Sequence, residues 1–107
     1  MKKFLVAMVL SISILTTLPA SAGAAAWLWS NHGSWTPTHT SCASVACPAD
    51  YWVPNNTKFI MRCYMDAQWA TGNYSSNRWF AGYPQYYSRY TYVHSSYVYY
   101  QYSVPRC

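Results

Sequence analysis

The stretch "TKFIMRCYM", residues 57–65, is the part of the chain that decides the fold class. Apolar and polar side chains alternate along it, which is the period-two pattern of a half-buried strand. One face carries Phe59, Met61, Cys63 and Met65, and the other carries Lys58, Ile60, Arg62 and Tyr64. The charges of Lys58 and Arg62 mark the outer face, so Cys63 is expected to point inward.

Turn formers and short β-type segments surround this strand. "VPNNT", residues 53–57, predicts a turn, because Pro54 fixes φ and the two asparagines tolerate tight conformations. Segments rich in Trp, Tyr, Phe and Val follow at residues 69–70, 78–80, 90–94 and 97–104, with Gly, Asn and Ser between them. Many short strands separated by such turns predict an all-β sandwich or small barrel. Residues 81–90, "AGYPQYYSRY", are expected to form an exposed loop.

The first residues have the three parts of a secretory signal peptide. Lys2 and Lys3 form a basic start, residues 4–18 form an apolar run, and residues 20–22 supply the small-residue cleavage pattern. The run is shorter than the roughly 20 residues that a membrane-spanning helix needs. We therefore expect residues 1–22 to be removed, the mature chain to be secreted, and no stable membrane insertion of that chain.

Residues 23–41 show little periodic pattern and are expected to form an irregular N-terminal arm or lead-in strand. Trp27, Trp29 and Trp35 are scattered there among Ser, Asn, Gly and Thr. These tryptophans either pack back on the domain or meet a partner, and packing is favoured because buried aromatic side chains dominate the core energetics of small domains.

The charge balance limits the choice of partner. The chain has seven Lys and Arg against two Asp and Glu, and loss of Lys2 and Lys3 lowers the formal net charge from +5 to +3. A weak positive charge favours an anionic surface such as a cell wall or membrane. Nucleic-acid binding needs a clustered basic stripe, so no nucleic-acid partner is expected.

All four cysteines, Cys42, Cys47, Cys63 and Cys107, lie in the predicted mature chain. An even count in a short exported chain predicts two disulfides, but four cysteines allow three pairings and spacing does not choose among them. The alternative is a metal site that combines His39 with Cys42 and Cys47, with His32 nearby. This spacing matches no zinc pattern well, so no metal or other cofactor is expected.

Two longer segments resemble a known family. "VPNNTKFIMRCYMDAQWATGNYSSNRWF", residues 53–80, and "YVHSSYVYYQYSVPRC", residues 92–107, are similar to the SH3-like domains that actinobacteria secrete. The family's G-x-Y-x-x-S-x-x-W block and its later strand pair are matched by Gly72, Tyr74, Asn77, Trp79, Tyr92, Val93, Tyr97, Val98, Pro105 and Cys107. The chain departs from the family at Thr91, where glycine is usual, and in the longer segment 81–90.

The resemblance implies a disulfide-stapled, SH3-like β-barrel of five or six short strands over residues 42–107. It also implies that Cys63 pairs with Cys107, which leaves Cys42 to pair with Cys47.

The sequence offers little for catalysis, which needs a nucleophile or metal with an acid–base partner. The acidic residues are Asp50 and Asp66, and both lie in expected turns, where local backbone hydrogen bonds are their usual role. The cysteines are expected to be oxidised, and a pair of His94 with Ser95 or Ser96 has no motif context. We expect a protein that is not an enzyme.

The aromatic content points instead to binding. The chain has 12 Tyr, 6 Trp and 3 Phe, and only Phe4 precedes the predicted cleavage site. A barrel of this size cannot bury all of them, and exposed aromatic patches normally mark a binding face. Cys63 and Trp79 are expected to face the core. The predicted ligand-binding residues are Tyr64, Trp69, Tyr74, Arg78, Tyr83, Tyr86, Tyr87, Arg89 and Tyr99.

The sequence therefore predicts a secreted, non-catalytic module that binds cell-wall material, either peptidoglycan peptide or glycan, through an exposed Tyr and Trp face. The alternative is a secreted, disulfide-stabilised effector, such as an inhibitor or an antimicrobial protein. The sequence leaves the oligomeric state open.

Overall fold

The computed structural model describes residues 25–107, and the predicted signal peptide lies outside the described residues. The described part is all-β, which confirms the predicted fold class. Its strands are β1 (Ala26–Leu28), β2 (Trp35–Thr38), β3 (Tyr51–Pro54), β4 (Thr57–Thr71), β5 (Ser75–Pro84), β6 (Thr91–His94) and β7 (Val98–Tyr99). One 3-10 turn, η1 (Ser95–Tyr97), joins β6 to β7. Over residues 25–107, no helix is long and apolar enough to cross a membrane.

Five strands form an antiparallel sheet in the order β6-β5-β4-β1-β7, and β2 pairs with β3 in a separate hairpin. The hairpin is tied to the edge strand β6 by two backbone hydrogen bonds between His39 and Tyr92, of 3.0 and 2.7 Å. No ladder joins β6 to β7 among the described strands, so the sheet is open and does not form the closed barrel that was expected.

Residues 26–38 were predicted to form an irregular arm or a lead-in strand, and they contain two strands, β1 and β2. β1 lies inside the five-stranded sheet between β4 and β7, and β2 forms half of the hairpin. Ala26 and Leu28 are fully buried, whereas Trp27 between them is only half-buried. The alternation is present, but a strand of three residues is too short to reveal it as a pattern. The folded unit therefore begins before residue 42.

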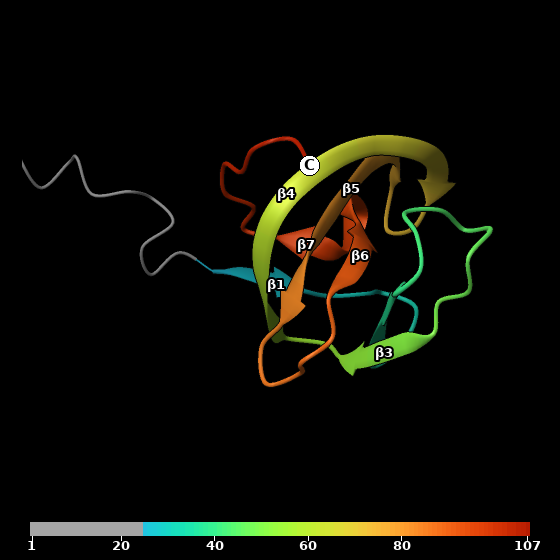
Figure 1. Ribbon diagram of the computed structural model, residues 1–107. Helices are drawn as coiled ribbons and strands as arrows, with labels where there is room; N and C mark the ends of the chain where they lie inside the picture. The colour runs from blue at the N-terminus through green and yellow to red at the C-terminus, as the bar shows by residue number, and fades with distance from the viewer. Residues whose placement is uncertain (1–24) are drawn as a thin grey trace, which may run out of the picture.

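β4 is one continuous strand of 15 residues that curves around the molecule (Figure 1). The sequence suggested a break at Asp66 and a separate short strand at Trp69. Instead, β4 continues through both residues and has a pairing irregularity between Asp66 and Ala70. Such irregularities bend a strand and increase its twist, which is how the end of β4 comes to lie over the other strands.

A second irregularity, between Met61 and Cys63, reverses the expected orientation of Cys63. Met61 pairs with Gly82 and Cys63 with the next residue, Ala81, so Arg62 is an extra residue in β4. One extra residue moves every later side chain to the other face. Tyr64 consequently packs against the core, and the inward orientation predicted for Cys63 is wrong.

The core lies on one face of the sheet and receives residues from almost every strand. Its buried members are Ala26, Leu28, Val53, Phe59, Met61, Phe80, Val93 and Val98. Phe59 and Met61 are on the face that the period-two pattern predicted. Asn56 has a positive φ of 73° in the predicted turn before β4, a conformation that asparagine tolerates better than most residues.

The C-terminal segment covers the edge of β4 beyond the end of β1. The Tyr102 hydroxyl accepts from the Met61 backbone N–H at 2.8 Å. Tyr64 donates to the Pro105 carbonyl at 3.0 Å, and Cys107 donates to the Tyr64 carbonyl at 2.8 Å. The Cys63–Cys107 disulfide fastens this segment, and the second disulfide joins Cys42 to Cys47. Both pairings implied by the family resemblance are confirmed.

Gly82 allows the close approach of β4 and β5 at the first irregularity. A Cβ atom there would lie 2.0 Å from the Ile60 carbonyl oxygen, which is backbone and cannot rotate away. We expect Gly82→Ala to lower the free energy of unfolding by about 3 kcal/mol, because the two strands must separate. The measurement is urea unfolding followed by tryptophan fluorescence.

Gly33→Ala is the matched control. Gly33 has φ of +144° and no atom within 4 Å of the added Cβ, so only the backbone conformation is penalised, by about 1 kcal/mol. A loss for Gly82→Ala no larger than that for Gly33→Ala would contradict the prediction.

Candidate functional site

A cavity of about 300 Å³ lies between the β2–β3 hairpin and the curved end of β4. We call it the Trp79 pocket after the residue at its base. Its other walls come from the Cys42–Cys47 loop, which connects β2 to β3, and from β5, β6 and the turn η1, so parts distant in sequence build it. The volume is at the lower end of the range of small-ligand sites.

Trp79 is held at the base of the pocket by a hydrogen bond and by two histidines. It is 1% exposed, and its Nε1–H donates to the Gln68 carbonyl at 2.9 Å. The rings of His39 and His94 meet it edge-on, with centroids 5.3 and 5.1 Å from the indole. His94 pairs with Trp79 across β5 and β6, and His39 is placed by its bridge to Tyr92. The predicted core orientation of Trp79 is confirmed.

His94 has both ring nitrogens occupied. Its Nε2 lies 2.9 Å from the Ser76 carbonyl, which can only accept, so Nε2 carries the proton. Nδ1 therefore accepts from the Ser96 hydroxyl at 2.8 Å. This histidine is a structural part of the pocket.

His39 has only one ring nitrogen occupied. Its Nδ1 lies 3.0 Å from the Cys47 carbonyl and by the same reasoning donates to it. In neutral imidazole Nε2 is then a hydrogen-bond acceptor. Nε2 has no hydrogen-bond partner anywhere in residues 25–107, although the side chain is 92% buried and lines the pocket.

The outer part of the pocket is apolar and partly exposed. Trp52, on β3, is 53% exposed, and its indole N–H donates to the Ala49 carbonyl at 2.7 Å. Pro37, Val45 and Pro48 lie beside it in the wall. The Cys42–Cys47 loop is attached to β4 because the Gln68 side-chain oxygen accepts from the Val45 backbone N–H at 2.9 Å and from the Ser44 hydroxyl. The disulfide loop is therefore a fixed wall.

None of the nine ligand-binding residues predicted from the sequence lines this pocket. Tyr64 and Arg78 do lie together, with the Arg78 guanidinium carbon 4.2 Å from the ring centre and that of Arg106 at 5.1 Å. Arg78 also forms an ion pair of 2.7 Å with Asp66, and this hydrogen bond lowers the pKa of the Asp66 carboxyl. Tyr64 and Arg78 are thus engaged within the protein.

Three further predicted residues form two other groups. Tyr83 stacks edge-on with Tyr90 at 5.1 Å, and burial raises the pKa of Tyr90. Tyr87 stacks on Tyr51 at 5.8 Å, and the Arg89 guanidinium lies 5.4 Å from the Tyr51 ring. None of these residues lines the pocket, although Tyr51 is the neighbour of Trp52, which does.

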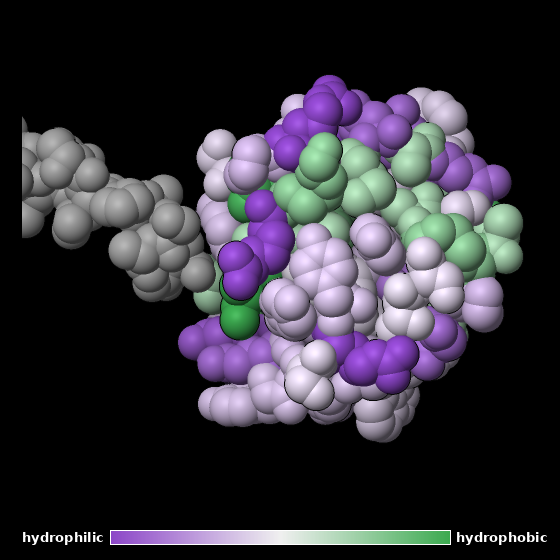
Figure 2. Space-filling model, in the orientation of Figure 1, coloured by the Kyte–Doolittle hydropathy of each residue, from purple (hydrophilic) through white to green (hydrophobic). Residues whose placement is uncertain are grey.

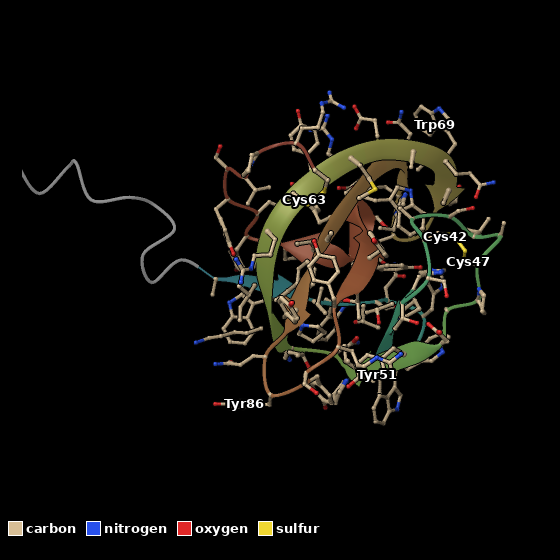
Figure 3. The ribbon with its side chains drawn as sticks, in the orientation of Figure 1. Cys42, Cys47, Tyr51, Cys63, Trp69 and Tyr86 are labelled. Atoms are coloured by element: carbon tan, nitrogen blue, oxygen red, sulfur yellow. A yellow bond between two sulfur atoms is a disulfide. The ribbon has the colours of Figure 1, made fainter. Side chains whose placement is uncertain are left out.

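The remaining predicted residues do not form one face. Trp69 is 67% exposed, and Figure 3 shows it at the opposite side of the molecule from Tyr86. Tyr74 and Tyr99 are also exposed, and each contacts the β4–β5 turn or η1 through its hydroxyl. In Figure 2, strongly hydrophilic residues lie along the top of the visible face and also within it, between hydrophobic residues and residues of intermediate hydropathy.

The sequence reasoning missed Trp52, His39 and His94 as site residues. His39 was considered only as a metal ligand beside the cysteines. Its neighbour Cys47 is oxidised, and within residues 25–107 no three His, Cys, Asp or Glu side chains converge on a possible metal position. His94 is the last residue of β6, after Thr91, Tyr92 and Val93, and was considered only as a partner of Ser95 or Ser96.

Comparisons of the chain with models of protein families, with curated proteins and with solved structures find no match.

Proposed function

We propose that the protein is a secreted, non-catalytic binding module that holds cell-wall polymer, peptidoglycan peptide or glycan, at the Trp79 pocket. The observation that carries the proposal is a preformed concave site with a buried tryptophan at its base, an exposed tryptophan at its edge and one ring nitrogen, His39 Nε2, that has no partner among the described residues and is accessible to solvent. Apolar pockets with a few convergent polar groups are the usual form of a ligand site. The net charge of +3 expected for the mature chain favours an anionic polymer.

An SH3-like architecture is part of this proposal. The two edge strands of the sheet, β6 and β7, are consecutive in the chain and are separated only by η1. A small barrel requires that the two edges of one curved sheet approach each other. The short η1 connection and the curvature of β4 support that arrangement, as does the sequence resemblance.

The groups that the sequence offered for catalysis are engaged in hydrogen bonds within the protein, which supports binding without catalysis. The Ser96 hydroxyl contacts His94, but Ser96 is fully buried and its oxygen also accepts from the Asn73 backbone N–H. Asp66 is paired with Arg78. The Asp50 carboxylate accepts two hydrogen bonds from Thr40, chiefly through the Thr40 hydroxyl, and these lower its pKa. These groups therefore act in folding rather than on a substrate.

Secretion is supported by the two disulfides, since such bonds form and persist in oxidising compartments. The predicted signal peptide accounts for the export of the chain from the cell.

Trp52→Ala tests the proposed site in a sedimentation assay with purified peptidoglycan. The wild-type protein is expected to sediment with the polymer. The variant is expected to bind about 30-fold more weakly, because loss of a tryptophan that contacts the ligand costs about 2 kcal/mol. The indole is exposed in the free protein, so its removal leaves the fold intact.

Trp69→Ala is the control, because Trp69 is even more exposed than Trp52 but lies outside the pocket. It is expected to bind as the wild type does. Equal losses for the two variants would contradict the site, and absence of wild-type sedimentation would contradict the function. Growth inhibition or membrane leakage by a protein that does not bind the wall would favour the effector alternative.

A further inference from the structure

The side chains that line the Trp79 pocket have very few free hydrogen-bonding groups. The indole N–H groups of Trp52 and Trp79 donate to the Ala49 and Gln68 carbonyls. The Thr71 hydroxyl is bonded to the Ser75 hydroxyl at 2.8 Å, and both nitrogens of His94 are occupied. Among the side chains that line the cavity, the described contacts leave only His39 Nε2 and the Tyr97 hydroxyl without a partner.

These two groups offer complementary chemistry. His39 Nε2 is an acceptor, because its Nδ1 donates to the Cys47 carbonyl. Burial raises the pKa of Tyr97, so the phenol keeps its proton at neutral pH and can donate. A ligand that satisfies both groups must supply one donor and one acceptor, with apolar surface between and around them.

We propose that the pocket takes one neutral peptide unit with a small apolar side chain, whose N–H donates to His39 Nε2. This inference rests on the proposed function and chooses between its two ligand classes. A peptide unit carries one N–H donor and one carbonyl acceptor, which matches the two free groups. The Tyr97 hydroxyl is then the donor for the peptide carbonyl.

A sugar fits the same pocket poorly. Each ring of a glycan carries several hydroxyl groups, and a buried hydroxyl without a partner costs binding free energy. The two free side-chain groups alone cannot satisfy them. A glycan has the exposed face of Trp52 as its alternative position, outside the cavity, and the experiment separates the two modes.

The test uses the mature protein and three probes at pH 8, above the range in which imidazoles ordinarily protonate. The first probe is N-acetyl-dialanine N-methylamide, the second is its ester analogue with oxygen in place of the central N–H, and the third is the N-acetylglucosamine trimer. The imidazole ¹⁵N resonances of His39 report a hydrogen bond to Nε2. We expect the amide to shift Nε2 saturably and the ester to bind about tenfold more weakly.

His39→Phe gives the matched protein change. Phenylalanine keeps a ring against Trp79 but has no acceptor, so amide and ester are expected to bind this variant equally, as followed by Trp52 indole N–H resonances. If the variant fails to fold, the comparison of amide and ester binding by the wild-type protein still tests whether His39 Nε2 accepts a hydrogen bond from the ligand. Equal binding of the two probes by the wild type overturns the role of His39, as does an Nε2 shift caused by the sugar trimer alone.

The outcomes also separate this inference from the proposed function. Wild-type protein that sediments with peptidoglycan but is not displaced by the peptide contradicts the peptide assignment and leaves wall binding intact. Protein that binds the amide but does not sediment contradicts wall binding and leaves the pocket chemistry intact.

Discussion

Replacing both Cys63 and Cys107 by alanine is expected to lower the free energy of unfolding by about 4 kcal/mol. The disulfide closes a loop with a sequence separation of 44 residues, and the loss follows from the chain entropy that the open loop regains in the unfolded state. The same bond holds the C-terminal segment against β4, where Cys107 and Pro105 contact Tyr64. The melting temperature should fall by roughly 15–30 °C for a domain of this size.

The paired replacement of Cys42 and Cys47 is the control. That disulfide has a sequence separation of only 5 residues, so the expected loss is about 2 kcal/mol. Chemical denaturation of both variants, beside the wild type, measures the difference. Equal losses, or a larger loss for the short loop, would show that contacts in the native state outweigh loop closure.

The two bonds are also expected to differ in their effect on the site. Cys47 lines the Trp79 pocket and supplies the carbonyl that fixes His39, whereas the Cys63–Cys107 bond joins β4 to the C-terminal segment and lines no part of the pocket. The first bond therefore shapes the wall of the pocket and the second stabilises the sheet.

The sequence predicted those parts of the fold that depend on local pattern. The alternation over residues 57–61 identified the inward face of β4, and the two asparagines before it identified a turn. Both signals need only neighbouring residues. The pattern failed at Arg62, because a bulge is fixed by the partner strand, here by Gly82 and Ala81, and leaves no local mark.

β1 was missed for a related reason. Ala26 and Leu28 are buried by β4 and β7, which are distant in sequence. Three residues carry too little alternation to be recognised, so the strand exists because of its neighbours rather than its own propensity.

The candidate site could not be predicted from residue type alone. The aromatic excess correctly indicated that many rings would be exposed, as Trp52, Trp69 and Tyr86 are. It did not indicate which ring lies beside a cavity, because His39, Trp52 and Trp79 meet only through the hairpin's attachment to β6. The site could therefore not be recognised from the sequence, because its residues are far apart in the chain. The prediction instead included aromatic residues that are close together in sequence, in segment 81–90.

Trp79→Ala is expected to lower the free energy of unfolding by about 4 kcal/mol, as is typical when a large buried ring is removed. The indole is 1% exposed and packs between His39 and His94, and the Gln68 carbonyl would lose its donor. Trp69→Ala makes the same change at a side chain that is 67% exposed, and its expected effect on the free energy of unfolding is within about 0.5 kcal/mol.

Urea unfolding and peptidoglycan sedimentation of both variants measure stability and binding together. Under conditions where the Trp79 variant is still folded, it should no longer sediment, because the base of the pocket is gone. A folded Trp79 variant that sediments normally would place the ligand on another surface. A large loss of peptidoglycan binding in the Trp69 variant would indicate that the exposed aromatic side chains bind the ligand.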